Sequence, residues 1–262
     1  MTTIHTIILS VIEGITEFLP ISSTGHMILA GKILGINSTD FTKSFEIIIQ
    51  LGSICAVAVL YLKTLFKNLD LLKKTFVAFL PTAVLGLIFY KIIKTYLLDN
   101  VWVVLASLFI GGIVIIWFEK KLAKTAPDQK IVPIDSNSIS YKKAFYIGLA
   151  QSVAMIPGVS RSAATIVGGQ LLGLSRTQIV EFSFILAIPT MAAATLLDVY
   201  KNYHLFSSAD IGQLSLGFIV SFVVALIAIK TFLKYIKKNS LSSFGWYRIV
   251  LAIISFIVFI KL

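Results

Sequence analysis

The sequence predicts an all-α polytopic membrane protein with about six transmembrane helices and two re-entrant helical hairpins in an inverted-topology repeat. Three observations predict this class: the composition, a series of long apolar stretches, and two apolar regions that are interrupted in similar ways. Hydrophobic residues make up 57% of the 262 residues and charged residues 13%, and the mean hydropathy is +0.93. Soluble domains carry about 25% charged residues, so the composition excludes a soluble globular protein as well as a disordered chain.

The charge and cysteine content exclude further classes. The net charge is +11, which in a polytopic protein is expected of basic loops. No basic stripe is interleaved with aromatic residues, so we expect no nucleic-acid partner. The single cysteine, Cys55, excludes an intramolecular disulfide and a cysteine-rich metal site. The sequence indicates no particular oligomeric state.

The apolar stretches fit membrane-spanning helices, which need about 20 mostly apolar residues each. The predicted spans are residues 45–62, 76–93, 101–118, 181–199, 211–231 and 247–261.

Lysine and arginine distribution predicts the orientation of these spans. The segments 63–74, 119–143 and 230–248 are basic, the last including Arg248, so we expect them in the cytoplasm. The connections 91–100 and 200–210 are poorer in Lys and Arg and belong outside. The interrupted regions 4–36 and 144–174 must then each enter the membrane and return on the same side. Both termini are therefore predicted outside, and each interrupted region is predicted to be a re-entrant hairpin.

The two hairpins resemble each other in the order of their helix breakers, hydroxyl residues and glycines. Aligning them places Glu13 on Gln151 and Ser22 on Ser160, with a one-residue slip at the prolines. Such repeats place binding sites near the membrane midplane, where helices are broken. We therefore expect one integral membrane domain, 1–262, with a first repeat half 1–118, a cytoplasmic linker 119–143 and a second half 144–262.

The first hairpin carries ionisable residues in an otherwise apolar segment. Glu13 and Glu17 are four residues apart and share a helix face. Pro20 ends the first half-helix, and His26 lies in the first turn of the returning one. The intervening hydroxyl residues, any of which can cap that helix, are Ser22, Ser23 and Thr24. Ionisable groups at membrane depth indicate a functional site.

The second hairpin has the features of an anion site. Pro157 and Gly158 break the helix, and Ser160 is the expected cap of the returning helix. Arg161 begins that helix, with the Ser162 and Thr165 hydroxyls nearby. A helix N-terminus and a guanidinium both bind anions.

If the hairpin tips meet, a multiply charged phosphate ligand fits the combined groups. The carboxylates would repel it unless they hold a divalent cation or one of them is protonated. From these features alone a transporter is an equally strong hypothesis, because inverted repeats with broken helices are a transporter architecture.

Three motifs resemble the bacterial undecaprenyl-diphosphate phosphatase family, the BacA-type bacitracin-resistance proteins. The first is Glu13-Gly-Ile-Thr-Glu17-Phe-Leu-Pro-Ile-Ser22-Ser23-Thr24-Gly25-His26. The second is Pro157-Gly158-Val159-Ser160-Arg161-Ser162-Ala-Ala-Thr165, and the third is Phe45-Glu46-Ile-Ile-Ile-Gln50-Leu-Gly52-Ser53. The resemblance covers the whole length and the order of spans.

The resemblance implies hydrolysis of undecaprenyl diphosphate to undecaprenyl phosphate and phosphate, supported by a divalent cation such as Mg²⁺ or Ca²⁺. This reaction recycles the lipid carrier of cell-wall synthesis and accounts for bacitracin resistance. It also implies a site open to the outer face of the cytoplasmic membrane, with a polyprenyl diphosphate substrate drawn from the membrane lipids. A flippase for undecaprenyl phosphate is a further alternative.

We assign roles to the motif residues on this basis. Arg161 binds the diphosphate and stabilises charge. Ser23 is the candidate nucleophile, activated by His26, although Ser22 and a water molecule stay open as alternatives. Glu17 orients His26, protonates the leaving group or ligates the cation, and Glu13 ligates the cation. The expected substrate-binding residues are Ser22, Thr24, Ser160, Arg161, Ser162 and Thr165. Glu46 and Gln50 are expected to support the site from the neighbouring span.

Overall fold

The structure is a computed structural model of residues 1–262, described except at residues 38, 98–99, 126–133, 135–137, 203–209 and 262. Its described residues form helices and connecting turns, with no strand among them. The all-α prediction is therefore confirmed.

Among the described residues, six helices are long and apolar enough to cross a membrane. They are α3 (Asp40–Lys67), α4 (Leu69–Ile92), α5 (Val101–Thr125), α8 (Arg176–Asn202), α9 (Ile211–Ile236) and α10 (Ser242–Lys261). Five of them contain a predicted span completely, and α4 contains the predicted span 76–93 except for its last residue, Ile93. A single π turn, η1 (Ile93–Leu97), follows α4.

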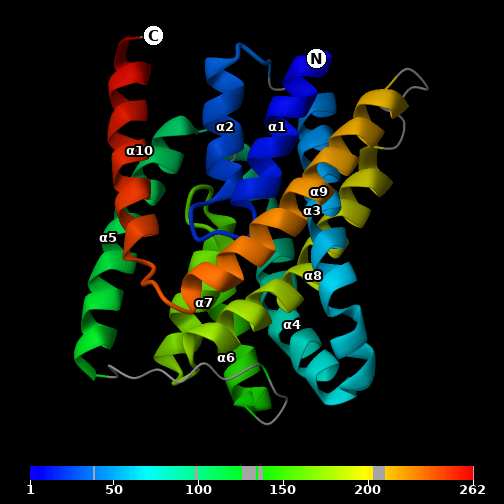
Figure 1. Ribbon diagram of the computed structural model, residues 1–262. Coiled ribbons are helices and arrows are strands. Elements are labelled where there is room, and N and C mark those ends of the chain that lie inside the picture. Colours follow the sequence, from blue (N-terminus) through cyan, green and yellow to red (C-terminus); the bar gives the residue numbers. More distant parts are fainter. Residues whose placement is uncertain (38, 98–99, 126–133, 135–137, 203–209, 262) are drawn as a thin grey trace.

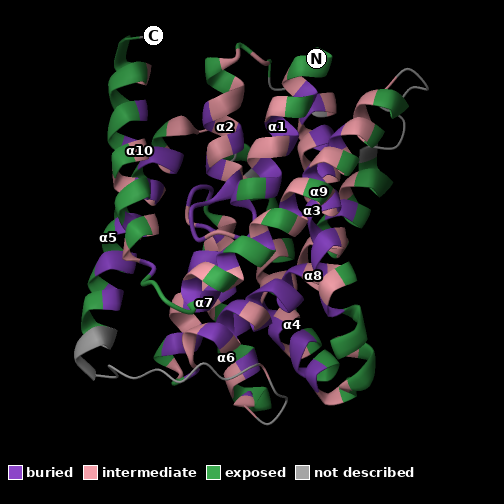
Figure 2. Ribbon diagram, in the orientation of Figure 1, coloured by how far each residue is buried: buried purple, intermediate pink, exposed green. Residues whose placement is uncertain are grey.

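Large apolar side chains point outward from these helices. Trp102, Leu87 and Ile253 are 52%, 70% and 47% exposed, and Figure 2 shows exposed residues along the outer faces of α4, α5 and α10. Such a surface suits lipid rather than water, since a soluble monomer rarely exposes large contiguous apolar patches. The protein is thus a multi-pass membrane protein.

Several helices are longer than the apolar runs that predict them. Only Asn68 separates α3 from α4, and its side chain caps α4 by accepting a 3.0 Å hydrogen bond from the Leu71 N–H. Residues 63–74 are therefore helical apart from Asn68. Helix α5 continues to Thr125, and 11 of the 25 residues of the expected linker 119–143 lie outside the described residues.

Arg248 is wrongly predicted to belong to a cytoplasmic loop. Helix α10 begins at Ser242, because the polar residues before the apolar run 247–261 are also helical. The side chain of Arg248 is fully buried.

The interrupted regions fold as two helical hairpins. The first contains α1 (Thr3–Thr16) and α2 (Ser23–Ile33), and the second contains α6 (Tyr141–Ser152), the short turn η3 (Val153–Met155) and α7 (Arg161–Leu171). The longest of these helices has 14 residues, fewer than the about 20 needed to cross a bilayer.

The hairpins open toward opposite edges of the molecule. In Figure 1 the open end of α1 and α2 lies at the edge that carries both termini, and α6 begins at the opposite edge. Their tips meet in between, where the Ser162 hydroxyl donates to the Phe18 carbonyl at 3.0 Å. This arrangement agrees with an inverted repeat, while re-entrance into a membrane and the division into two halves stay predictions.

The returning helices start in the same unusual way. Ser22 and Ser160 have φ angles of 70° and 77°, in a region that L residues rarely adopt. Each is an N-cap, with its hydroxyl accepting a hydrogen bond from the backbone N–H of Gly25 or Ala163 at 3.2 Å. The predicted cap Ser160 is therefore confirmed, and of the three hydroxyl residues that could cap α2 the structure selects Ser22.

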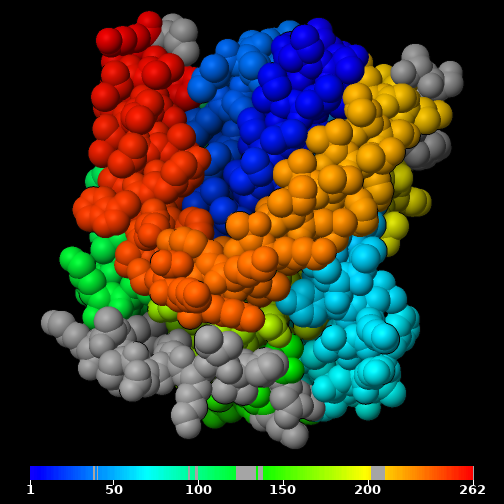
Figure 3. All heavy atoms as spheres, in the orientation of Figure 1, coloured from blue at the N-terminus to red at the C-terminus, as the bar shows by residue number. Residues whose placement is uncertain are grey.

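Long helices surround the hairpins and hold their tips. Helix α9 crosses α1 and α3 on the face seen in Figure 3, α8 packs on α3, α4 on α6, and α5 on α10. Phe18, at the first tip, is fully buried and packs edge-on against Phe184 of α8, with ring centroids 5.3 Å apart. The main apolar core thus anchors the break in the first hairpin.

Candidate active site

A cavity of about 250 Å³ lies where the two hairpin tips meet. The first hairpin contributes Glu17, Ser22, Ser23 and Thr24 to its wall, and the second contributes Gln151, Pro157, Ser160 and Arg161. The remaining polar lining comes from Gln50 of α3, Thr82 of α4 and Thr190 of α8. Residues from all three sequence motifs thus line one cavity, as expected if the hairpin tips meet.

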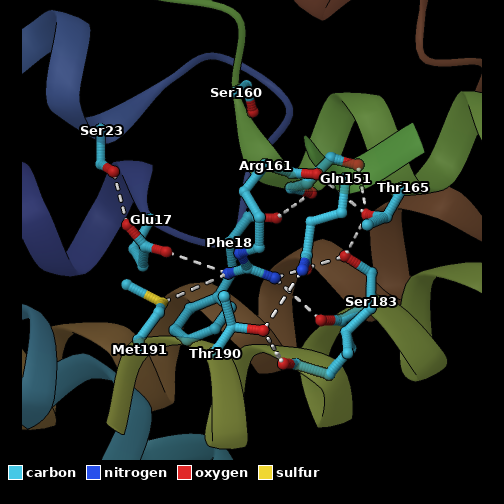
Figure 4. Close-up of polar contacts among 12 residues, drawn as sticks. Glu17, Phe18, Ser23, Gln151, Ser160, Arg161, Thr165, Ser183, Thr190 and Met191 are labelled. Atoms are coloured by element: carbon cyan, nitrogen blue, oxygen red, sulfur yellow. Dashed lines mark hydrogen bonds and ion pairs between the residues drawn. The ribbon is translucent and has the colours of Figure 1, made fainter. Parts of the chain in front are cut away.

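The Glu17 carboxylate connects the two hairpins (Figure 4). Its Oε2 accepts a hydrogen bond from the Ser23 hydroxyl at 2.5 Å, and its Oε1 pairs with Arg161 Nη2 at 2.9 Å. Glu17 lies just after the end of α1, where the backbone is still helical, and Ser23 is the first residue of α2. The turn between them, which contains Pro20, brings the acid and the hydroxyl together.

Arg161 is held on several sides. Its Nη1 donates to the Ser183 carbonyl at 2.8 Å, and its guanidinium carbon lies 5.7 Å from the centre of the Phe18 ring. Its Nε–H is buried and has no acceptor among the described residues. The guanidinium therefore has a fixed orientation and one buried N–H group without an acceptor in the described structure.

The opposite wall of the cavity is uncharged. The Gln151 amide donates to the hydroxyls of Thr82 at 2.8 Å and of Thr190 at 3.3 Å. Each threonine directly follows a proline inside a helix, Pro81 in α4 and Pro189 in α8. The sequence analysis assigns no role to these threonines, although a Pro-Thr pair within an apolar span is a usable signal.

Glu13 lies behind the cavity, fully buried in α1. Neither oxygen of its carboxylate receives a hydrogen bond in the described part of the chain. The charges of Glu17 and Glu46 are near enough to interact with it. Within the described residues, no three His, Cys, Asp or Glu side chains form a closed metal-binding cluster. One or two carboxylates fit the coordination of Mg²⁺, which takes its other oxygen ligands from water and phosphate.

Comparison with known proteins decides the family. Residues 6–254 match the family model described as "Bacitracin resistance protein BacA". The chain belongs to this family. It is 49% identical over 254 residues to the undecaprenyl-diphosphatase of Aquifex aeolicus, covering 97% of each chain. It is 50% identical over 260 residues to that of Sulfurihydrogenibium sp., covering 98% of this chain and 99% of the relative. The family prediction is confirmed.

In this BacA-family chain, His26 does not pair with Ser23. Its Nδ1 donates to the Ser22 carbonyl at 2.7 Å, and its Nε2 contacts the Tyr247 hydroxyl at 2.8 Å. The expected activation of Ser23 by His26 has no contact to support it in this structure, because both ring nitrogens have other partners and the Ser23 hydroxyl donates to Glu17. The sequence spacing places His26 and Ser23 on one helix face, whereas the turn between the helices decides the actual partner.

Two other residues expected at the substrate lie outside the cavity wall of this BacA-family site. Ser162 is fully buried and binds the Phe18 carbonyl, and Thr165 hydrogen-bonds the Ser183 hydroxyl at 2.7 Å. These hydroxyls join the hairpins to each other and to α8. Ser22, Thr24, Ser160 and Gln50 do border the cavity.

Proposed function

We propose that this protein hydrolyses undecaprenyl diphosphate to undecaprenyl phosphate and inorganic phosphate. The reaction recycles the lipid carrier of cell-wall synthesis and confers bacitracin resistance. Family membership and the names of the relatives support this activity. The observation that carries it is the Glu17 carboxylate between the Ser23 hydroxyl and Arg161, in a cavity formed by two helix N-termini.

In the mechanism that this arrangement supports, Ser23 Oγ attacks the terminal phosphorus while Glu17 Oε2 accepts the hydroxyl proton. The bond from that phosphorus to the bridging oxygen breaks, and undecaprenyl phosphate leaves with the electron pair. Water then cleaves the phosphoserine, with Glu17 returning the proton to Ser23. Direct attack by water, with Glu17 as the base, is the alternative.

Charge that develops on the transferred phosphoryl group needs preorganised donors. Arg161 supplies its Nε–H, which has no other acceptor in the described structure. A helix N-terminus leaves its first N–H groups free for an anion. Those of α2 come from Ser23 and Thr24, and those of α7 from Arg161 and Ser162.

We assign a divalent cation, Mg²⁺ or Ca²⁺, to the Glu13 side of the site. Glu13 has two buried oxygens without a hydrogen-bond donor in the described structure. The carboxylates of Glu17 and Glu46 act on it, and Arg161, which pairs with Glu17, offsets only part of this negative charge. When bound, the cation would neutralise charge on the diphosphate. Glu17 is the second proposed ligand, although its two oxygens are already hydrogen-bonded in this structure.

The site belongs in the bacterial cytoplasmic membrane and opens toward its outer face. This placement rests on the basic segments at the edge opposite the termini, where residues 63–74 and the start of α6 lie. The prenyl chain of the substrate would extend sideways among the helices and membrane lipids.

The deciding experiment measures phosphate release from undecaprenyl diphosphate by detergent-purified protein with Mg²⁺ or Ca²⁺. We expect turnover that Ser23→Ala abolishes, and a phosphoenzyme that acid quenching traps only when Ser23 is present. Turnover without a phosphoenzyme would favour water as the nucleophile. Lipid transfer across proteoliposomes without phosphate release would instead support the flippase or transporter alternative.

A further inference from the structure

Arg248 is a buried cation whose hydrogen bonds all go to backbone carbonyls. It is 0% exposed, and all five of its N–H groups are used. Nε donates to the Leu108 carbonyl at 3.3 Å, and Nη2 donates to the Ser107 carbonyl at 2.9 Å, both in α5. Among the described residues it forms no ion pair. Since burying a guanidinium is costly, this complete set of acceptors indicates a specific role.

The remaining donors join the two hairpin tips. Nη1 donates to the carbonyls of Pro20 at 3.2 Å and Val159 at 2.9 Å, and Nη2 also donates to the Gly158 carbonyl at 2.8 Å. One side chain from α10 thus binds both tips of the proposed catalytic site and anchors them to α5.

These bonds fix the peptide planes that lead into both returning helices. In a trans peptide the N–H points opposite to the carbonyl, so the N–H of Ser160 points away from Arg248. Ser22 and Ser160 follow the clamped segments, and both have strained positive φ angles. A strained backbone persists only where its surroundings hold it in place. The Arg248 contacts supply that restraint one residue before Ser160, at Val159, and two residues before Ser22, at Pro20.

Helix α5 leaves space for this guanidinium. A side chain at Gly111 would collide with Nη2 and Cζ of Arg248. The neighbouring Gly112 meets Gly245 of α10 at a close crossing, where a Cβ would lie 2.6 Å from the Gly245 carbonyl oxygen. The Gly111 position therefore accommodates the arginine and gives a way to displace it without changing it.

We propose that Arg248 is a positioning residue for the hydrolysis: it fixes both hairpin tips so that the first-turn N–H groups of α2 and α7 point at the transferring phosphoryl group. This inference rests on the proposed active site. Arg248 does not border the cavity and acts through the backbone it holds. Groups that are aimed at the transition state contribute mainly to kcat, so its loss should affect kcat more than KM.

The test compares Arg248→Lys and Gly111→Ala with the unmodified protein in detergent, using farnesyl diphosphate as a soluble substrate. Lysine keeps the charge but offers only three donors from one atom. We expect kcat to fall about 10–100-fold with KM little changed, because small misplacements of catalytic groups cost that much. The affinity for orthovanadate, a transition-state mimic, should fall in the same variants in which kcat falls. The inhibition constant for inorganic phosphate should stay the same.

Gly212→Ala is the matched control, since no atom lies within 4 Å of the added Cβ, and it should behave as wild type. Unchanged kcat and vanadate affinity in both folded variants would overturn the proposal. It would also be overturned if activity fell only in proportion to the folded fraction, measured by thermal unfolding and size exclusion, or if neither variant folded. Ser23→Ala in the same assay tests the nucleophile separately: an active Ser23→Ala protein would exclude Ser23 as the nucleophile, while the positioning role of Arg248 would still be decided by the Arg248→Lys and Gly111→Ala variants.

Discussion

At the scale of single residues, the site depends on groups that each have several fixed partners. Arg161 binds Glu17, the Ser183 carbonyl and the face of Phe18 at once. Lysine cannot reproduce this planar arrangement of donors. The substitutions that test single residues therefore keep either the charge or the shape of the original side chain.

We expect Arg161→Lys to lower kcat by about 10²–10³-fold, comparable to removing one oxyanion-hole donor. Folding should persist, since the charge toward Glu17 is kept. Phosphate release and thermal unfolding measure the two effects. Arg176→Lys is a suitable control, because Arg176 also pairs with a buried glutamate, Glu119 at 2.8 Å, yet does not border the cavity. Near-normal turnover of the Arg161→Lys variant would contradict the catalytic role assigned to Arg161.

The two acids should respond differently to amide substitution. Glu13→Gln should raise the cation concentration needed for half-maximal activity, because an amide is a poorer ligand for a hard cation than a carboxylate. Glu17→Gln should lower the maximal rate even at saturating cation, because an amide cannot accept the Ser23 proton. Titrations of activity with Mg²⁺ and Ca²⁺ distinguish the effects. If both variants changed only the cation requirement, the proton-transfer role of Glu17 would be wrong.

At the scale of elements, each hairpin needs close backbone contact with a long helix. The second hairpin packs α6 on α4 at Gly148, where an added Cβ would collide with the Ala78 carbonyl. The Thr82 hydroxyl donates to the Gly148 carbonyl at 3.0 Å. This contact sets the position of Gln151, three residues further along α6, in the cavity wall.

Gly148→Ala should therefore destabilise the protein by about 1–3 kcal/mol, the usual cost of overpacking. The thermal unfolding temperature in detergent measures it. Gly86→Ala is the control in α4, since its Cβ would lie 3.8 Å from Met155 Cε, an ordinary contact. Equal stability of the two variants would show that α6 can move away from α4 without cost.

At the scale of the whole molecule, the number of membrane crossings decides whether the two termini share a side, and the basic segments decide which side that is. If both hairpins return to their side of entry, the six long helices of the described chain leave both termini on one side, and Figure 1 places both termini at one edge. The junction of α3 and α4 lies at the other edge.

Single cysteines at Thr3 and Lys261, in a Cys55→Ala background, should react with an impermeant thiol reagent in intact spheroplasts. Cysteines at Lys67 and Lys142 should react only after the membrane is opened. All four positions are exposed, so accessibility within the protein does not limit the reaction. If both termini were labelled only after permeabilisation, the orientation in the membrane would be opposite to the one proposed. Labelling of one terminus alone would mean that one hairpin crosses the membrane.

The sequence by itself determines the elements of this protein. Apolar length predicts the six long helices, and Pro20 and Pro157 predict the hairpin breaks, since both signals are local. The same local signals identify Ser160 as a cap, limit the other cap to Ser22, Ser23 or Thr24, and place the charged motif residues in two segments.

Only the tertiary structure decides which of these residues meet. Ser23 pairs with Glu17 and not with His26 because the turn between α1 and α2 returns toward the end of α1. Arg248 binds carbonyls that lie 89 to 228 residues away in sequence. From the sequence alone it is therefore grouped with the neighbouring basic residues, and only the packed helices show its partners. Such long-range contacts depend on how α5 and α10 cross. Close packing at Gly112 and Gly245 sets this crossing, and Gly111 leaves space for the arginine. No local sequence pattern encodes the crossing.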